Sequence, residues 1–363
     1  VVTRPPSNTE TVAIGALPAA LVFGASLVRL VGTPRLFGQT WSYAVDWQFE
    51  PVPRAQLESY LSSRPGDAAW TFGEHLSLTA GHQDIPAIGL VPGQGKPIWP
   101  TVLEGREPRG PDEILLGTKS LEAIGHRVGE RIDVTMQGDS AERPMRIVGR
   151  AVFPFFGEGS FTPTGLGTGA AFEDPAPDPS GFTFFLVRSG SASTRPPSPD
   201  ALQARGVCPS DQTCGIFTAQ RPLDLTDYAT VQSTPLALAG VLALLALAAL
   251  AHALVTTTSR RRRDLAVLKT LGFVRGQVAG VVLSEASVLA LLALAIGVPL
   301  GVAGGRWLWS VFAGRLGVLP QPVVPTWFLV AVVPLTLVVA NLLAAIPGLL
   351  AARRPAAPFL RTE

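Results

Sequence analysis

The sequence predicts a membrane α-helical protein in which one transmembrane helix precedes, and three follow, a large α+β extracytoplasmic domain. Four apolar stretches of about the length of a bilayer are the first observation behind this fold class. The second is charge: residues 32–234 hold 16 basic and 23 acidic residues, whereas the remainder holds 13 basic and 4 acidic ones. Only 15% of the 363 residues are charged, against about 25% in soluble domains.

The first apolar stretch, residues 12–28, is the weakest of the four. A transmembrane helix needs roughly 20 predominantly apolar residues, and this stretch is short and contains Pro18. A signal peptide is therefore the alternative interpretation at this place. Because the chain also starts with Val rather than Met, a form truncated at the N-terminus is one expectation. The other three predicted spans are residues 235–256, 278–302 and 326–352.

Arginines beside the apolar stretches predict the orientation. Short loops rich in Lys and Arg stay in the cytoplasm. Residues 32–234 are then extracytoplasmic, residues 1–31 form the N-terminal transmembrane region, and residues 235–363 form a three-span domain. The second outer connection is residues 305–325, where Trp307 and Trp309 are expected at the membrane interface. The arginines in question are Arg260, Arg261, Arg262 and Arg263 between spans two and three, and Arg353 and Arg354 after span four.

The extracytoplasmic block has the pattern of a mixed α and β domain. Several segments are rich in β-branched and aromatic residues, as strands are. Two polar segments, residues 53–65 and 117–129, have helical periodicity. Residues 173–180 and 195–199 are Pro-rich and predict loops. The strand-like segments are residues 41–50, 69–80, 130–136, 145–155 and 182–188.

The loop between spans two and three predicts a short amphipathic helix. Leu265, Leu268 and Leu271 recur every three residues, and Gly272 is placed to end the helix. A cytoplasmic helix with an apolar stripe, held between two membrane spans, is typical of a docking element. A nucleic-acid surface is the competing interpretation of the arginine run, but that run abuts a membrane span and lacks interleaved aromatic residues.

The residues that enzymes and metal sites require are not clustered. His75 and His82 lie seven apart, which is not the spacing of a helical metal pair. No phosphate-binding loop and no nucleophile elbow is present in the sequence, so we predict no catalytic residue, no metal and no cofactor of its own. Cys208 and Cys214 predict a disulfide that closes a loop, provided that the block is extracytoplasmic.

Glu285 is the strongest candidate among polar residues inside the predicted spans. Such residues are functional candidates by default, although pairing with the basic loop, for instance with Arg275, is the structural alternative. Asn341, Ser284 and Ser287 are expected to support helix packing by hydrogen bonds. These residues form no continuous chain of charges through the bilayer, which disfavours ion-coupled transport.

Residues 257–301 resemble the FtsX-like permease family of ABC transporters, of the MacB type. The family pattern is an Arg-rich start, an acid, and Leu-x-x-Leu-(Arg/Lys)-x-Leu-Gly. Residues 105–134 and 145–154 show a weaker resemblance to the MacB-type periplasmic core, and residues 23–41 are similar to long actinobacterial members. The matching residues are Arg263, Asp264, Leu265, Leu268, Lys269, Leu271, Gly272 and Phe273, followed by Gln277 and Glu285.

The resemblance implies a permease subunit of the bacterial plasma membrane. The basic loop would be a coupling helix that sits on a separate cytoplasmic ABC ATPase, which binds the ATP, and a second permease half would complete the complex. The arginines at the membrane surface would contact lipid headgroups. A membrane-anchored receptor or sensor is the alternative function, although only about 12 residues follow span four to carry its output. The substrate and the direction of transport stay open.

Overall fold

The structure is a computed structural model that divides into two compact units. It describes residues 8–47, 50–138, 141–156, 164–178, 181–191, 193–208, 215–218 and 275–353, with isolated residues between 237 and 252. The membrane unit comprises Val1–Val28, Val231–Ser310 and Pro322–Glu363. The α+β unit comprises Arg29–Thr230 together with Val311–Gln321.

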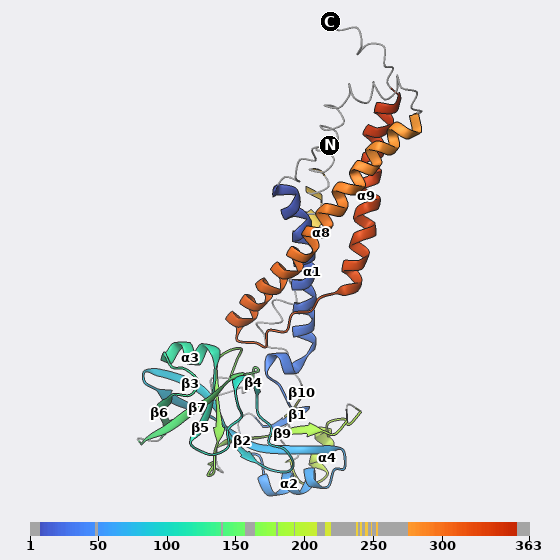
Figure 1. The fold of residues 1–363 in the computed structure, drawn as a ribbon. Coiled ribbons are helices and arrows are strands. Elements are labelled where there is room, and N and C mark those ends of the chain that lie inside the picture. Colours follow the sequence, from blue (N-terminus) through green and yellow to red (C-terminus); the bar gives the residue numbers. More distant parts are fainter. Residues whose placement is uncertain are drawn as a thin grey trace. The chain divides into compact units, whose positions relative to one another are not determined.

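One mixed sheet forms the framework of the α+β unit (Figure 1). Its main path runs β10-β1-β9-β2-β3-β8-β5-β7-β4, and β6 pairs with both β2 and β7. The strands β2, β3, β8, β5, β7 and β6 therefore close into a ring. The strands are β1 (Tyr43–Asp46), β2 (Asp67–Ala80), β3 (Gln83–Pro92), β4 (Thr101–Gly105), β5 (Glu113–Gly117), β6 (Arg131–Met136), β7 (Glu142–Val152), β8 (Ala170–Glu173), β9 (Phe182–Ser189) and β10 (Ile216–Thr218).

The long strand β2 connects the two halves of this sheet. Residues from Asp67 to His75 pair with β9, and Leu78–Ala80 pair with β6 inside the ring. A two-residue turn joins β2 to β3, and its Gly81 has a φ of +63°, a conformation that glycine adopts without steric cost. The ring interior is filled by aliphatic side chains such as Leu78, Val134 and Ile147.

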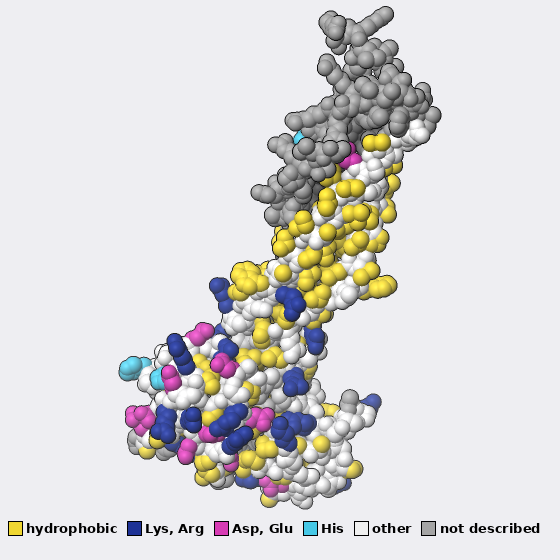
Figure 2. Space-filling model, viewed as in Figure 1, with side chains coloured by type: hydrophobic (Ala, Val, Ile, Leu, Met, Phe, Trp, Pro, Cys, Tyr) yellow, Lys and Arg dark blue, Asp and Glu magenta, His cyan; other side chains and the backbone are white. Residues whose placement is uncertain are grey.

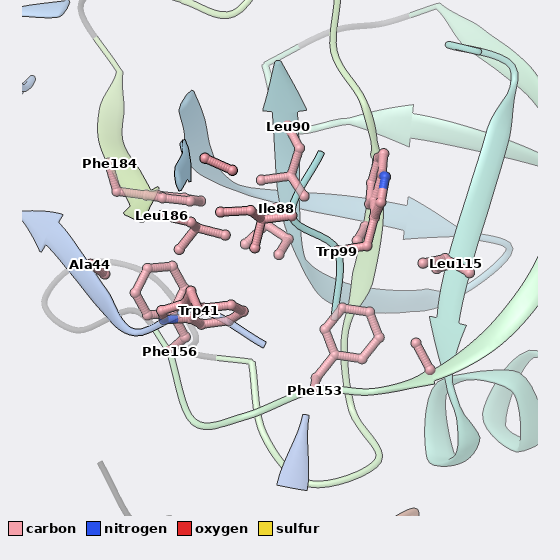
Figure 3. Close-up of a cluster of buried hydrophobic side chains, with 14 of the residues drawn as sticks. Trp41, Ala44, Ile88, Leu90, Trp99, Leu115, Phe153, Phe156, Phe184 and Leu186 are labelled. Atoms are coloured by element: carbon pink, nitrogen blue, oxygen red, sulfur yellow. The ribbon is translucent and has the colours of Figure 1, made fainter. Parts of the chain in front are cut away.

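Helices cover the sheet at both ends. In α2 (Arg54–Ser62), Leu57 and Leu61 are buried one turn apart, as an amphipathic helix requires. They pack with Leu202 of α4 (Pro199–Gln203) in one cluster. The other short helix, α3 (Thr118–Ile124), contacts β3, β5 and β7. A third, central cluster holds Trp41, Ile88, Phe156, Phe184 and Leu186 (Figure 3).

The sequence-based expectations for this unit are confirmed for the elements that were named. The five predicted strands correspond to β1, β2, β6, β7 and β9, and the two predicted helices to α2 and α3. The strands β3, β4, β5, β8 and β10 were not anticipated. The predicted Pro-rich loop at residues 195–199 ends where α4 begins, because Ser198 caps that helix through a hydrogen bond from the Ala201 amide.

Three apolar helices make up the described part of the membrane unit. They are α1 (Asn8–Gly32), α8 (Arg275–Leu316) and α9 (Thr326–Arg353). Among the described residues, Leu283–Leu316 and Thr326–Ala345 are long and apolar enough to cross a membrane, and Ala16–Gly32 is a shorter apolar helix. Apolar side chains cover the visible faces of α8 and α9 (Figure 2). Most of the predicted second span, residues 235–256, lies outside the described residues.

The connection between α8 and α9 is shorter than the sequence predicted. The loop was expected over residues 305–325, but α8 continues to Leu316 and leaves only residues 317–325 between the helices. Gly304 and Gly305 both lie within α8. Gly305 allows close packing, because a Cβ there would lie 2.8 Å from the carbonyl oxygen of Ala19 in α1.

Candidate functional site

The predicted coupling helix lies outside the described residues. This applies to Arg260, Arg261 and Arg262 and to Arg263, Asp264, Leu265, Leu268, Lys269, Leu271, Gly272 and Phe273, and to Arg354 beyond the end of α9. Their roles therefore stay predictions. The structure does describe the element that follows them, because α8 begins at Arg275 and runs for 42 residues without interruption.

A polar contact joins α8 to α9 inside the membrane unit. The Asn341 amide nitrogen donates to the Ser287 hydroxyl at 3.0 Å and to the Leu337 carbonyl at 2.9 Å. Small residues meet beside it, since Ala286 and Ala344 are both fully buried. The expectation that Ser287 and Asn341 support packing agrees with this geometry, whereas Ser284 bonds back to Val281 of its own helix.

Glu285, two residues before Ser287 in α8, is half-buried. It follows Ser284 and precedes the buried Ala286. Nothing in the described geometry assigns it a transport role, so its function remains a prediction. Glu285 therefore lies within one helical turn of the residue of α8 that bonds Asn341.

The contact between α1 and α8 corrects one expectation. Trp307 is 68% exposed, as a residue of the membrane interface should be, but Trp309 is only 1% exposed. Trp309 packs edge-on against Phe23 of α1, with ring centroids 5.5 Å apart. Helical periodicity separates the two tryptophans, because residues two apart point in different directions around a helix.

Two groups of buried ionisable residues lie in the α+β unit. His75 Nε2 is 2.8 Å from Asp46 Oδ2, and its ring packs against Phe156 and Phe184. The Tyr43 hydroxyl donates to Asp67 Oδ2 at 2.8 Å, and Arg64 donates to the same oxygen at 2.8 Å. Burial, followed by the hydrogen bond to Asp67, raises the pKa of Tyr43 well above its ordinary value.

These groups are arranged as structural links rather than as a reaction centre. His75 is oriented by the Asp46 carboxylate and enclosed by the rings of Phe156 and Phe184. His82 lies in the exposed turn between β2 and β3, away from the buried pair. Within the described part of the chain, no group of three His, Cys, Asp or Glu side chains is placed to hold a metal ion.

A third buried carboxyl, Glu74, neighbours two aspartates. Its Oε2 accepts a hydrogen bond from the Asp178 amide at 2.9 Å, and Asp174 lies against it at the end of β8. Burial, followed by the hydrogen bond with Asp174, raises the pKa of Glu74 to about 8. Sequence reasoning missed this group because Glu74 and Asp174 are 100 positions apart in the chain.

Cys208, five residues after the end of α4, is buried and takes part in a disulfide. Its predicted partner, Cys214, lies outside the described residues, so the pairing stays a prediction. Cys208 also lines a cavity of about 470 Å³ with Trp47, Pro51, Pro53, Gln203, Gly206 and Val207.

The C-terminal third of the chain matches a known family. Residues 236–356 match the FtsX-like permease C-terminal family. The resemblance to FtsX-like permeases stated from the sequence is thus confirmed for this part of the chain. The matched region contains both helices that are long and apolar enough to cross a membrane, which agrees with a permease of this family.

Three solved structures are similar to the chain at low identity. The periplasmic region of MacB from Actinobacillus actinomycetemcomitans is 10% identical with a TM-score of 0.32, over 56% of this chain and 97% of that one. A permease domain from Porphyromonas gingivalis is 10% identical with a TM-score of 0.30, over 50% and 92%. The extracellular domain of the noncanonic ABC-type transporter YknZ from Gram-positive bacteria is 10% identical with a TM-score of 0.26, over 46% and 88%. No curated protein sequence matches this chain.

Proposed function

We propose that this chain is the permease subunit of an ABC transporter that couples ATP hydrolysis by a separate cytoplasmic ATPase to movement of its extracytoplasmic α+β unit. The movement would drive export, extraction or mechanotransmission. The observation that carries the proposal is the course of α8. This one helix starts at Arg275, directly after the predicted coupling segment, and its last six residues belong to the α+β unit.

The matched family region supports the location of the cytoplasmic contact. The match over residues 236–356 includes the whole basic loop and nearly all of the predicted spans on either side of it. Leu265, Leu268 and Leu271, with Phe273, would form the docking face, because apolar side chains at this spacing share one side of a helix. Lys269 would lie at the edge of that face, about one turn after Leu265.

Basic residues at the membrane surface would hold the loop in place. Arg260, Arg261 and Arg262, with Arg353 and Arg354, would contact lipid headgroups of the cytoplasmic leaflet. The chain would be a multi-pass protein of the bacterial plasma membrane, and a second permease half, identical or different, would complete the transporter. Pro299 interrupts the hydrogen-bond ladder of α8, which supports bending of this helix during the cycle.

Replacing Leu268 with Asp tests the proposed coupling helix. A charge in the middle of the apolar face is expected to abolish recovery of the ATPase, because the carboxylate would lose its water on docking. The measurement is a pull-down of the tagged, detergent-solubilised full chain from its host, with an ABC ATPase identified in the eluate. Leu268→Met is the matched control, since it keeps an apolar side chain of similar volume.

Membrane insertion of both variants is checked by carbonate extraction, so that loss of the ATPase is not confused with loss of the protein. Equal recovery of the ATPase with Leu268→Asp and with the unmodified chain would show that this helix is not the docking element. Recovery of no ATPase from any of the three proteins would contradict the transporter function itself and favour an anchored receptor.

A further inference from the structure

The helix α8 is about twice as long as a bilayer requires. Its 42 residues extend over about 63 Å, against about 30 Å for the hydrocarbon core. Trp307 and Arg306 mark the level of the membrane interface, and both are exposed. The remaining residues of α8 extend about 14 Å beyond Trp307. We call residues 311–321 the α8 connector, because this segment belongs to the α+β unit although it follows directly from a membrane helix.

The α8 connector has a defined helix end. The Gly317 amide donates to the Gly314 carbonyl and the Val318 amide donates to the Ala313 carbonyl, which is the Schellman pattern. Gly317 has a φ of +73°, as the residue after the helix must in this motif. Ala313 and Val318, which occupy the two positions of the hydrophobic contact in this motif, are both buried. The helix therefore ends in a rigid, packed turn rather than in a loose loop.

Two glycines bring the connector against the rest of the α+β unit. A Cβ on Gly317 would lie 2.7 Å from the Cα of Gly167 and 3.3 Å from the Cβ of Thr118. Gly167 has a φ of +77° and belongs to the turn between Gly165 and Thr168, whose backbone groups bond each other. A larger residue at Gly317 would therefore displace the backbone of Gly167, and a Cβ on Gly167 would lie 3.2 Å from the Leu316 carbonyl oxygen.

The same turn holds the first turn of α3. The Gly167 carbonyl accepts hydrogen bonds from the amides of Lys119 at 2.7 Å and Ser120 at 3.3 Å. These amides are among the groups at a helix N-terminus that need partners from outside the helix. A displacement of Gly317 would therefore act on Gly167 and, through its carbonyl, on α3, which packs on β3, β5 and β7.

A second contact joins the connector to the segment that follows α1. The Leu319 amide donates to the Leu36 carbonyl at 3.2 Å, and Leu36 lies in the short helix η1 (Pro34–Phe37). Thr101 at the start of β4 bonds the Arg35 carbonyl of the same short helix at 2.8 Å. The connector is thus attached at two points, to the turn at Gly167 and to η1.

We infer that the α8 connector is a mechanical joint, in which the packing of Gly317 on Gly167 and the bond from Leu319 to Leu36 transmit movement of α8 to α3 and the sheet of the α+β unit. This inference rests on the proposed function, since it needs an ATPase to move α8. It goes beyond that function in naming the residues through which the movement reaches the outer unit.

The experiment compares hydrogen exchange in the full chain, assembled with its ATPase in lipid nanodiscs, without nucleotide and with ATP plus vanadate. In the unmodified complex, nucleotide is expected to change exchange both in the peptide covering the loop before α8 and in the peptide covering the first turn of α3. In Gly317→Val, the response of the loop is retained and the response of α3 is lost. Gly314→Val is the matched control, because a Cβ on Gly314 would meet no atom within 4 Å.

A second pair of variants tests the other contact and guards against misfolding. Leu319→Pro removes the amide that bonds Leu36, whereas Leu319→Ala keeps it, so only the former is expected to lose the α3 response. Exchange in the β2–β3 hairpin reports whether the α+β unit is folded in each variant. If either joint variant keeps the full α3 response, or if the unmodified complex responds in the loop but not in α3, the joint is refuted. If the ATPase does not bind the unmodified chain, the proposed function fails first and the joint fails with it.

Discussion

Replacing Phe184 with Ala is expected to destabilise the α+β unit by about 3–5 kcal/mol, the usual cost of removing a fully buried aromatic ring. Phe184 is completely buried in the central cluster (Figure 3). Its ring centroid is 4.5 Å from that of His75 and 4.8 Å from that of Phe156. Loss of the ring would leave a cavity beside the buried pair of His75 and Asp46.

Gly73 lies against Phe184, and combining substitutions at the two positions tests that contact directly. It pairs with Phe184 across β2 and β9, and a Cβ on Gly73 would lie 2.6 Å from Phe184 Cζ and 2.8 Å from Leu90 Cδ2. The ring therefore covers the bare backbone of the glycine. Gly73→Ala alone is expected to cost about 1–3 kcal/mol through overpacking. In the Phe184→Ala background the same substitution should cost clearly less, because the ring that it would strike is gone.

The measurement is urea-induced unfolding of the α+β unit in the full chain, followed by tryptophan fluorescence. Phe182→Ala on the same strand is the control, since Phe182 is only half-buried and should cost less. Additive effects of Gly73→Ala and Phe184→Ala would contradict the direct contact between the two residues. A cost of Phe184→Ala no greater than that of Phe182→Ala would contradict its place in the core.

The stability of the α+β unit is expected to fall as the pH rises toward and through 8 because of Glu74. The pKa of this carboxyl is raised to about 8 by burial, by the hydrogen bond with Asp174 and by the charges of Asp174 and Asp178. A raised pKa means that the folded unit binds the proton more tightly than the unfolded chain does. This contribution is complete below the ordinary pKa of Glu, about 4.5, and is lost as the pH rises through the folded value.

Glu74→Gln is the variant that isolates this effect. The amide resembles the protonated carboxyl, because it can donate toward Asp174 and accept from the Asp178 amide. Relative to Glu74→Gln, the unmodified chain should lose free energy of unfolding between pH 5 and 9, by at most about 1.4 kcal/mol per pH unit for one proton. The measurement is the free energy of unfolding in urea at a series of pH values.

Glu113→Gln serves as the control of opposite sign. The hydrogen bond from Arg106 is the main reason why the pKa of Glu113 lies below its ordinary range. The stability that ionised Glu113 contributes is therefore lost only when the pH falls through that low value. Between pH 5 and 9 the curve for Glu113→Gln should run parallel to that of the unmodified chain. A parallel curve for Glu74→Gln over the same range would mean that Glu74 is not protonated in the folded unit near neutral pH.

Much of the fold could be predicted from local patterns. The strands β2 and β9 are rich in aromatic and β-branched residues, and α2 has buried leucines one turn apart, so each was visible in a short window of sequence. The strand β3 was missed although it is ten residues long, because Pro86, Gly89 and Pro92 interrupt its pattern. Its place is decided by pairing with β2 on one side and β8 on the other, which no local window contains.

The candidate site was predictable to a smaller extent. The apolar stripe at Leu265, Leu268 and Leu271 is a local pattern, and the family match now covers it. The pairing of Ser287 with Asn341 was expected as packing support, since polar side chains inside a membrane seek each other. The contact of Gly317 with Gly167 had no such signal, because a glycine in the sequence does not show which backbone it will approach.

The sequence by itself indicated the apolar helices α1, α8 and α9 and the mixed α and β character of the α+β unit, because hydropathy, charge and periodicity act within a few turns of chain. Only the tertiary structure decided that the strands close into a ring, that Glu74 is buried beside Asp174, and that the end of α8 belongs to the α+β unit. The physical reason is common to all three. Each depends on contacts between residues far apart in the chain, and such contacts are selected by packing of the whole unit rather than by local preference.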